Sequence, residues 1–146
     1  MNWFECRITH EKTLENGLVK KVTEPYLVDA ISHTEAEARI IEEVRPYISN
    51  HFEVATIRPQ KISEMFFSEE ECADKWYKVK LEFITLDEKS GNEKRTKVSV
   101  MVQAADIRDA LKKLDEGMKG TMADYDIVQI TETNVMDVYP ISYEAH

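Results

Sequence analysis

The sequence predicts an α+β fold built by tandem duplication of a ββαβ(β) unit, with antiparallel sheets and one helix in each repeat. Three observations predict it. A displacement of 73 residues places Trp3 on Trp76, and these are the only two tryptophans in the chain. The same displacement places FEVATI (52–57) on YDIVQI (125–130). Finally, each half carries strand-type alternation on both sides of one helical apolar pattern.

These matches predict a single compact domain over residues 1–146. Repeat one covers residues 1–67, and repeat two covers residues 75–140. The acidic, polar segment SEEECAD (68–74) joins them as a linker, and its three glutamates at 69–71 are expected to avoid packing. We expect a pseudo-two-fold relation between the repeats, which either share one sheet or pack through their apolar faces. The alternative is two unrelated strand-rich halves that share a generic alternation.

The first repeat opens with two strands. Aromatic and β-branched residues alternate with polar residues over 3–12. Asn16-Gly17 predicts a hairpin turn, because both turn residues must tolerate positive φ. A second strand follows over 18–31, and we expect it to bend or bulge near Pro25, which has no backbone N–H.

The helix of the first repeat lies in SHTEAEARIIEEV (32–44). Thr34 and Glu37 predict a capping box, in which the hydroxyl and the carboxylate each accept a backbone N–H. The predicted apolar stripe consists of Ala38, Ile41, Val44 and Ile48, with Ile40 beside it. After the helix we expect a strand at 51–57 and a short extended segment at 61–67.

The second repeat follows the same order. Its strands are expected over 76–86, 96–102, 125–131 and 135–140. Gly91 marks the turn between the first two strands, Asp106 is the expected N-cap of the helix, and Gly117 and Gly120 end that helix. The apolar residues at helical spacing are Ile107, Ala110, Leu111, Leu114 and Met118. Within the helices the displacement between the repeats is expected to be 73 or 72.

The composition indicates a folded protein with a well-solvated surface. Hydrophobic residues make up 42% and charged residues 32% of the chain, and the net charge is −9. This acidic balance disfavours non-specific contact with nucleic acid or an anionic membrane, although a local basic patch would override it. No apolar run approaches the roughly 20 residues that cross a bilayer, and no signal-type segment opens the chain. We therefore expect a cytoplasmic protein with reduced thiols at Cys6 and Cys72.

The sequence assigns no catalytic, cofactor or metal site. Four glycines exclude a glycine-rich phosphate loop, and the four histidines have no metal-ligand spacing. His33, with Glu35 and Glu37 nearby, fits a solvated helix start better than a metal site. Cys6 lies at a packing position of a strand, and Cys72 lies in an acidic setting that opposes thiolate formation. We therefore expect no catalytic residues, no metal and no cofactor, and we favour a non-enzymatic protein.

One basic cluster surrounds the second predicted hairpin. The candidate nucleic-acid contacts are Lys78, Lys80, Lys94, Arg95 and Lys97. Phosphate contacts from these side chains, with stacking on Trp76 and Tyr77, would form a nucleic-acid surface. We favour a soluble hairpin whose lysines block pairing at a strand edge, because Asp87, Glu88 and Glu93 interrupt the cluster.

The ordered set of motifs resembles a known family. The set comprises the aromatic strand at Trp3-Phe4, the hairpin, the TEAEARI helix start (34–40) and the aromatic strand at Trp76-Tyr77. Over nearly the whole chain it is similar to the uncharacterised family catalogued as domain of unknown function 4494, which occurs in Bacteroides-type bacteria and their phages. The resemblance implies no activity and no site residues. Its phage members imply a role in a prophage or another mobile element.

We therefore expect a small cytosolic binding or assembly protein without enzymatic activity. Its partner would be an unknown protein or a second copy of the chain, and not a membrane. Two alternatives stay open. One is a nucleic-acid-associated accessory protein that uses the basic hairpin, tested by reversing the charges of Lys94 and Arg95. The other is a small enzyme with a site between the repeats, which would require a deep pocket with convergent polar groups.

Overall fold

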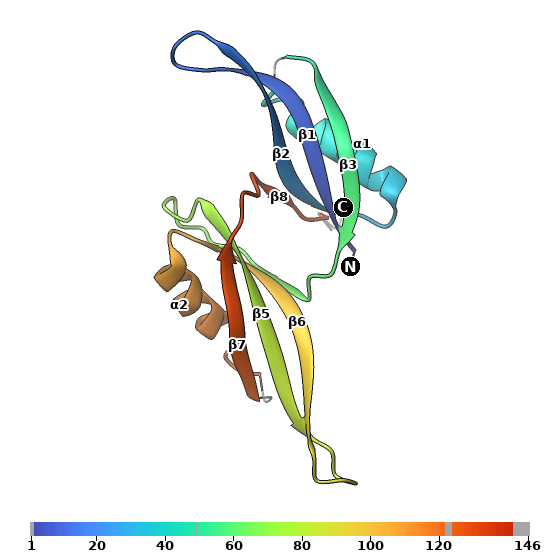
Figure 1. Cartoon of the computed structure of the whole chain (residues 1–146), viewed down its shortest axis with the longest axis vertical. Coiled ribbons are helices and arrows are strands. Elements are labelled where there is room, and N and C mark those ends of the chain that lie inside the picture. The colour runs from blue at the N-terminus through green and yellow to red at the C-terminus, as the bar shows by residue number, and fades with distance from the viewer. Residues whose placement is uncertain (1, 49, 122–123, 142–146) are drawn as a thin grey trace, which may run out of the picture. The chain divides into compact units, whose positions relative to one another are not determined.

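The computed structural model describes residues 2–48, 50–121 and 124–141 (Figure 1). Over these residues the protein is α+β, with two helices and two four-stranded sheets that are mainly antiparallel. The chain divides into two units. Unit 1 combines Met1–Gln60 with Asn134–His146, and unit 2 is the continuous segment Lys61–Thr133.

Unit 1 is a sheet of strand order β3-β1-β2-β8 with α1 packed on one face (Figure 1). Its elements are β1 (Trp3–Thr13), β2 (Val19–Asp29), α1 (His33–Val44), β3 (Phe52–Gln60) and β8 (Val138–Tyr139). β1 pairs antiparallel with β2 and β3, whereas β8 runs parallel to β2. The core forms where Cys6 and Ile8 of β1 meet Ile40 of α1.

Unit 2 is a sheet of strand order β4-β6-β5-β7 with α2 on one face. Its elements are β4 (Glu64–Phe66), β5 (Lys75–Leu86), β6 (Glu93–Ala104), α2 (Ile107–Gly117) and β7 (Asp124–Glu132). β5 pairs antiparallel with β6 and β7, whereas β4 runs parallel to β6. Its core forms where Val79 and Leu81 of β5 meet Leu114 of α2.

Helix α1 begins two residues earlier than the predicted capping box places it. The Ser32 hydroxyl accepts the backbone N–H of Glu35 at 3.1 Å, so Ser32 is the N-cap and the prediction of Thr34 was wrong. Both hydroxyl residues stand three positions before a glutamate, so the local pattern fits either. His33, now in the first turn, lies with its Nε2 3.2 Å from the carbonyl oxygen of Ile57 in β3. This long-range contact favours the earlier start.

The buried face of α1 is rotated relative to the predicted stripe. The buried residues are Ala36, Ile40 and Val44, followed by Ile48 after the helix. Ala38 is exposed and Ile41 is half-buried, so the prediction was wrong at Ala38 and underestimated Ile40. The observed spacing of four residues is the one that keeps side chains on a single helix face.

Helix α2 and the position of the first hairpin agree with their local signals, but the turn differs from the expected one because Gly17 has a positive φ and Asn16 does not. The Asp106 side chain accepts the backbone N–H of Asp109 at 2.8 Å, which confirms Asp106 as the N-cap. The helix ends at Gly117, and Gly17 adopts a φ of +82° in the turn that joins β1 to β2. Of the predicted stripe, Ala110, Leu114 and Met118 are buried, Leu111 is half-buried and Ile107 is exposed.

Strand β2 contains no bulge at Pro25, contrary to expectation. Pro25 lies opposite Arg7 in an unbroken ladder with β1. The carbonyl of Pro25 accepts the N–H of Met136, so it points away from β1. The nitrogen of Pro25 points to the same side. Because proline therefore lacks a donor only on the side away from β1, the ladder with β1 loses no hydrogen bond. The register shifts occur instead between β1 and β3 and between β5 and β7, the latter at Lys80/Leu81.

Each trailing strand lies within one predicted repeat but belongs to the unit formed by the other repeat. Predicted repeat one extends to residue 67, but β4 belongs to unit 2 and pairs with β6. Predicted repeat two extends to residue 140, but β8 belongs to unit 1 and pairs with β2. Parallel pairing joins segments far apart in the chain, so a pattern read along the sequence does not report it.

The acidic segment 68–74 is part of unit 2. Its three glutamates at 69–71 are exposed, as predicted, but the segment around them is anchored. The backbone N–H of Ser68 donates to the side-chain oxygen of Gln103 at 3.0 Å, and Ala73 is buried. Lys113 of α2 donates to the Ser68 hydroxyl at 2.8 Å and pairs with Glu70 at 3.2 Å. The segment is therefore held at both the sheet and the helix of unit 2.

Candidate functional site

The sheet of unit 2 presents a polar face on the side opposite α2. Val79 and Leu81 of β5 pack beneath α2, and because strand side chains alternate, Lys80 between them lies on the opposite face. We call this the open face. Ser99 of β6 lies directly opposite Lys80, and Lys97 shares the open face two positions along β6. Diagonal pairs of this kind have Cα atoms roughly 7–8 Å apart, within reach of two long side chains.

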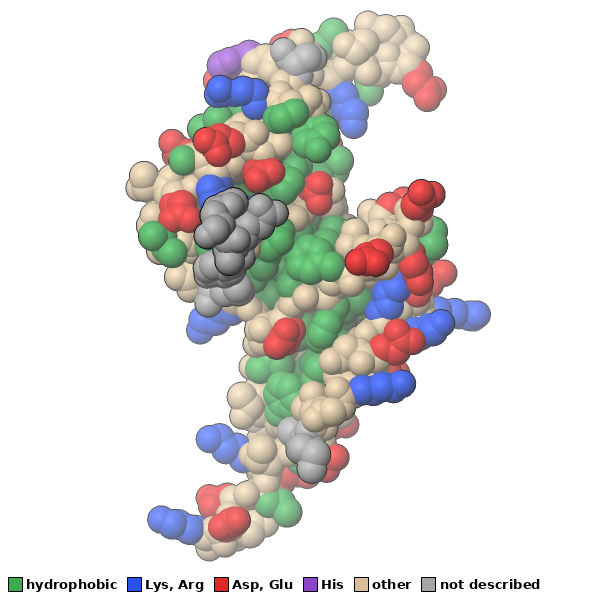
Figure 2. Space-filling model, turned by 180° about the vertical axis from the view of Figure 1, so that it is seen from behind, with side chains coloured by type: hydrophobic (Ala, Val, Ile, Leu, Met, Phe, Trp, Pro, Cys, Tyr) green, Lys and Arg blue, Asp and Glu red, His purple; other side chains and the backbone are tan. Residues whose placement is uncertain are grey.

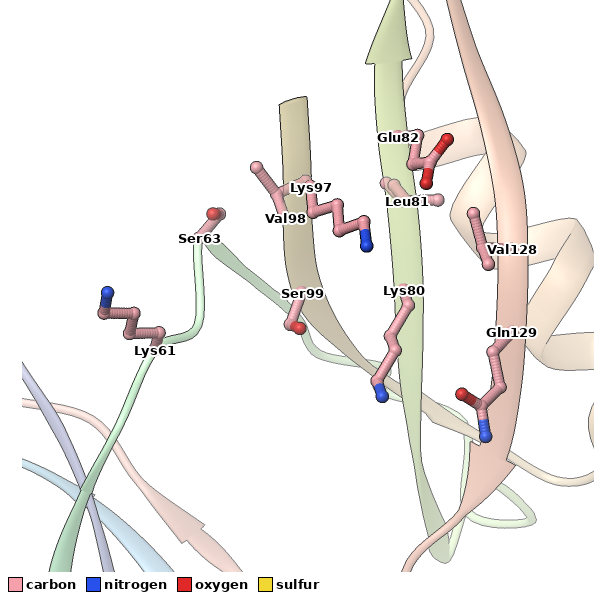
Figure 3. Close-up of a pocket in the computed structure, with 10 residues that line it drawn as sticks. All are labelled: Lys61, Ser63, Lys80, Leu81, Glu82, Lys97, Val98, Ser99, Val128 and Gln129. Atoms are coloured by element: carbon pink, nitrogen blue, oxygen red, sulfur yellow. The ribbon is translucent and has the colours of Figure 1, made fainter. Parts of the chain in front are cut away.

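A hollow of about 500 Å³ lies on the open face (Figure 3). Its polar lining consists of Lys61, Ser63, Lys80, Glu82, Lys97, Ser99 and Gln129. The first two come from the segment before β4, and the others come from β5, β6 and β7. Gln129 lies opposite Lys80 because the register between β5 and β7 shifts there, which leaves Val128 as an extra residue on the rim.

The lysines of the hollow form no ion pairs with the residues that the structure describes, although Glu82, which lies opposite Lys97 in the ladder, also lines the hollow. Within the described part of the chain, Lys61, Lys80 and Lys97 have no carboxylate within ion-pair distance. Lys75, by contrast, pairs with Glu132 at 3.5 Å. Elsewhere basic and acidic side chains lie interspersed, as the surface in Figure 2 shows. The hollow is therefore a local basic site in a chain whose net charge is −9.

Arg95 also lies on the open face, but its charge is taken up by neighbours. Its guanidinium donates to Asp126 at 2.9 Å, to Glu82 at 3.1 Å and to Glu93 at 3.3 Å. The hydrogen bonds to Asp126 and then Glu82 raise the pKa of Arg95 above its usual value. Glu82 lines the hollow, and it shares the single positive charge of Arg95 with Glu93 and Asp126, so the group stays acidic. The four side chains mark the acidic boundary of the hollow.

The structure separates the five sequence-derived candidates into three kinds. Lys78, Lys80 and Lys97 share the open face. Lys94 lies opposite Thr85 in the ladder, hence on the other face of the hairpin, and it does not line the hollow. Arg95 is on the open face but is paired with carboxylates.

Sequence reasoning named Lys80 and Lys97 among the polar lining residues and missed the other five. Lys61 and Ser63 precede β4, and their place follows from the parallel pairing of β4 with β6. Gln129 reaches the hollow through the register shift between β5 and β7. The alternation over TKVSVMV did carry a signal for Ser99, because it lies on the same face as Lys97.

The tryptophans are not available as stacking platforms. Trp76 is 3% exposed and packs edge-to-face against Phe67, with ring centroids 5.4 Å apart. Trp3 is 5% exposed. No aromatic residue lines the hollow over the ranges that the structure describes. Base stacking, which the sequence offered as part of a nucleic-acid surface, therefore has no partner there.

The thiols give no nucleophile at the hollow. Cys6 is completely buried in unit 1, and burial raises the pKa of its thiol to about 12. Cys72 is exposed in the acidic segment, with its sulfur 3.9 Å from a carboxylate oxygen of Glu70. Both cysteines are free. Neither lines the hollow, so the chemistry there belongs to amines, hydroxyls and an amide.

Two further findings concern the described residues as a whole. Among them, no three His, Cys, Asp or Glu side chains converge as a metal site would require. Neither helix there has the length and apolarity needed to cross a membrane.

The fold and the hollow define a small α+β protein with two sheet-and-helix units, one of which carries a basic face. A family model, Domain of unknown function (DUF4494), matches residues 2–141, and the chain belongs to this family. The match confirms the resemblance drawn from the aromatic strands and the helix start. No curated protein matches the chain.

Proposed function

We propose that this is a non-enzymatic binding protein that holds an anionic ligand on the open face of unit 2. One observation carries the proposal: Lys61, Lys80 and Lys97 surround one hollow without carboxylate partners among the described residues. Ammonium groups left unpaired beside one another repel, and an anion relieves that repulsion. Ser63, Ser99 and Gln129 add neutral hydrogen-bonding groups at the same place.

The chemistry of the lining supports binding over catalysis. A serine nucleophile needs an adjacent base, and the lining holds no histidine among the described residues. Its carboxylate, Glu82, is already engaged in a hydrogen bond from Arg95 at 3.1 Å. The side chains that line the hollow therefore suit binding of a charged ligand better than catalysis.

Charge reversal tests the proposal with a matched control. Lys80→Glu with Lys97→Glu changes the charge of the hollow by four, and Lys89→Glu with Lys94→Glu makes the same change in the hairpin outside it. We expect the first pair to weaken binding of inorganic polyphosphate at least tenfold at low salt, measured by calorimetry. The second pair should change it less than threefold. Equal effects, or no binding by the parent protein, would refute the proposal.

We also propose that the two units arose by duplication. The strand orders β3-β1-β2-β8 and β7-β5-β6-β4 support it, because equivalent strands occupy equivalent places in the two sheets. In each sheet the strand after the helix lies at one edge, the two hairpin strands lie in the middle, and a short trailing strand lies at the other edge. Trp3 and Trp76 open the equivalent strands 73 apart, whereas Ala36 and Ala110 are 74 apart. The loop 87–92 is one residue longer than the loop 14–18, which accounts for the change.

This helix displacement differs from the predicted 73 or 72. Duplication predicts that an experimental structure of each unit superposes with Trp3 on Trp76 and Ala36 on Ala110. A different register in that superposition would contradict it.

The cellular setting is a proposal based on the family resemblance. We propose that the protein acts in the cytoplasm within a prophage or another mobile element, and that it associates with a protein partner or a second copy. Phage genes beside the genes of family members and a solution mass above 17.0 kDa would support this. Chromosomal neighbours without phage genes, together with a monomeric mass, would count against it.

A further inference from the structure

We infer that the anion held on the open face is a single-stranded nucleic acid, DNA or RNA, bound through its phosphates and without base stacking. This inference rests on the proposed function and names its ligand class. It depends on three features of the hollow: the spacing of its cations, its neutral polar groups and the absence of aromatic lining from the described residues.

The cations are distributed along the sheet and do not converge on one point. Lys80 is on β5, Lys97 is diagonal to it on β6, and Lys61 comes from the segment before β4. Lys78 continues the row on β5, two residues from Lys80 and hence roughly 6–7 Å along the strand. Spaced point charges match the spaced phosphates of a polymer.

A compact phosphate ligand fits this site less well. Proteins hold isolated phosphate groups with backbone N–H groups at a helix N-terminus or in a glycine-rich nest. Helix α2 packs on the other face of the sheet. The backbone of Lys80 and Ser99 at the floor of the hollow belongs to strand ladders.

A carboxylate-rich peptide is the rival ligand, and binding of such a peptide in place of every single strand would overturn the inference. The planar fork of arginine makes two parallel hydrogen bonds with a carboxylate or a phosphate alike. Arg95 is the arginine on the open face near the hollow, and its guanidinium already donates to Asp126, Glu82 and Glu93. The groups left for a ligand are lysine ammoniums, which act as point charges toward phosphate.

The size and the lining of the hollow favour a single strand over a duplex. A duplex is a stiff rod that does not bend into a concavity of about 500 Å³, whereas a single strand follows the surface. Without aromatic lining among the described residues, the bases have no platform, so the sequence is not read. Ser63, Ser99 and Gln129 are placed to hydrogen-bond sugar or phosphate oxygens.

The inference predicts how steeply the binding affinity falls as the salt concentration rises. Neutralising Z phosphates of a single strand gives a slope of log K against log salt of about −0.7Z. With Lys61, Lys80 and Lys97 engaged, the slope is about −2, which is roughly a 20-fold loss of affinity from 50 to 200 mM salt. Removing one lysine by Lys97→Ala should reduce the slope to about −1.4, or roughly a 7-fold loss over the same range.

The experiment uses the full chain and fluorescence anisotropy with labelled oligo(dT), oligo(dA), oligo(rU) and a duplex of equal length, with inorganic polyphosphate as competitor. We expect oligo(dT) and oligo(dA) to bind within about threefold of each other, more tightly than the duplex, with the predicted slopes. Oligo(rU) distinguishes an RNA ligand from a DNA ligand. Lys94→Ala, outside the hollow, should leave the slope unchanged.

The outcomes of this experiment distinguish a failure of the nucleic-acid inference from a failure of the proposed function. Binding of polyphosphate without binding of any single strand would overturn the nucleic-acid inference and keep the anion site. A duplex bound as tightly as the single strands, a strong base preference, or a slope that Lys97→Ala does not change would also overturn it. No binding of any anion would overturn both.

Discussion

Gly117→Ala should destabilise unit 2, although alanine is the better helix former. Gly117 is the last residue of α2, and a methyl group added to its Cα would lie 2.6 Å from Phe66 Cε1 and 2.8 Å from Cδ1. Phe66 is in β4 and packs against the core of unit 2. The substitution therefore sets helix propensity against packing.

The two effects have different sizes. Replacing glycine by alanine in a helix gains up to about 1 kcal/mol. Carbon atoms pack at roughly 3.5–4.0 Å, so the Phe66 ring must move by about 1 Å. Overpacking of this kind costs about 1–3 kcal/mol. β4 is only three residues long and resists such a shift weakly, so we expect a net destabilisation of about 0.5–2 kcal/mol.

Urea unfolding followed by tryptophan fluorescence measures this quantity. A Trp3→Phe background leaves Trp76 as the reporter of unit 2, where it is buried against Phe67 beside β4. The same substitution of Gly117 is then made with Phe66→Ala. Without the ring, alanine at position 117 should become neutral or stabilising by up to about 1 kcal/mol.

The double-mutant cycle of Gly117→Ala and Phe66→Ala gives the results that would refute this reasoning. If Gly117→Ala stabilises unit 2 while Phe66 is present, the ring does not oppose the methyl group. If the free energy of unfolding changes equally in both backgrounds, the two sites are not coupled. Either result contradicts the contact between α2 and β4.

Three further outcomes are expected. Leu114→Ala, at a fully buried position, should lower the free energy of unfolding by about 3 kcal/mol in urea titrations, and a cost below 1 kcal/mol would contradict its place in the core. Burial raises the pKa of Cys6 to about 12, so a thiol reagent at neutral pH should modify exposed Cys72 at once and Cys6 only on unfolding; immediate loss of both thiols would argue against this burial. The backbone N–H of Ala105 is the main cause of the lowered pKa of Asp109. A lowered folded pKa means that ionised Asp109 stabilises the fold above the ordinary value of 3.8, and that this stabilisation is lost as the pH falls through the folded pKa. Asp109→Asn should therefore flatten the acid side of the stability profile, and unchanged curvature below pH 4 would refute the assignment.

Local signals predicted local structure well. Asn16-Gly17 and Asp106 depend on the chemistry of a few neighbouring residues. The structure confirms a hairpin at Asn16-Gly17 and the N-cap at Asp106, although only Gly17 of the turn pair has a positive φ. Ser32 and Thr34 fit the same capping pattern, so the choice between them depended on the contact of His33 with β3. The two candidate N-caps lie two residues apart, and the buried face of α1 is rotated from the predicted one.

Pairing between distant strands limited how much of the hollow could be predicted from the sequence. The sequence placed Lys78, Lys80 and Lys97 near one another through a hairpin, and the ladder puts them on one face. Lys61 and Gln129 join the hollow through a parallel strand and a register shift, which are set by contacts between distant segments. The same kind of contact moved β4 and β8 across the predicted boundaries. Neither feature has a sequence signature comparable to a turn or a cap.

The discontinuity of unit 1 sets an order of events on the ribosome. Unit 2 is one uninterrupted stretch, so its sheet can close as soon as β7 has left the exit tunnel. Unit 1 starts earlier in the chain but lacks β8 until residues 134–140 are made, and only then does β2 gain the hydrogen bond from the N–H of Leu27 to the carbonyl of Asp137. The half translated first is therefore completed last. During that interval the β2 edge is exposed to chaperones and to other nascent chains.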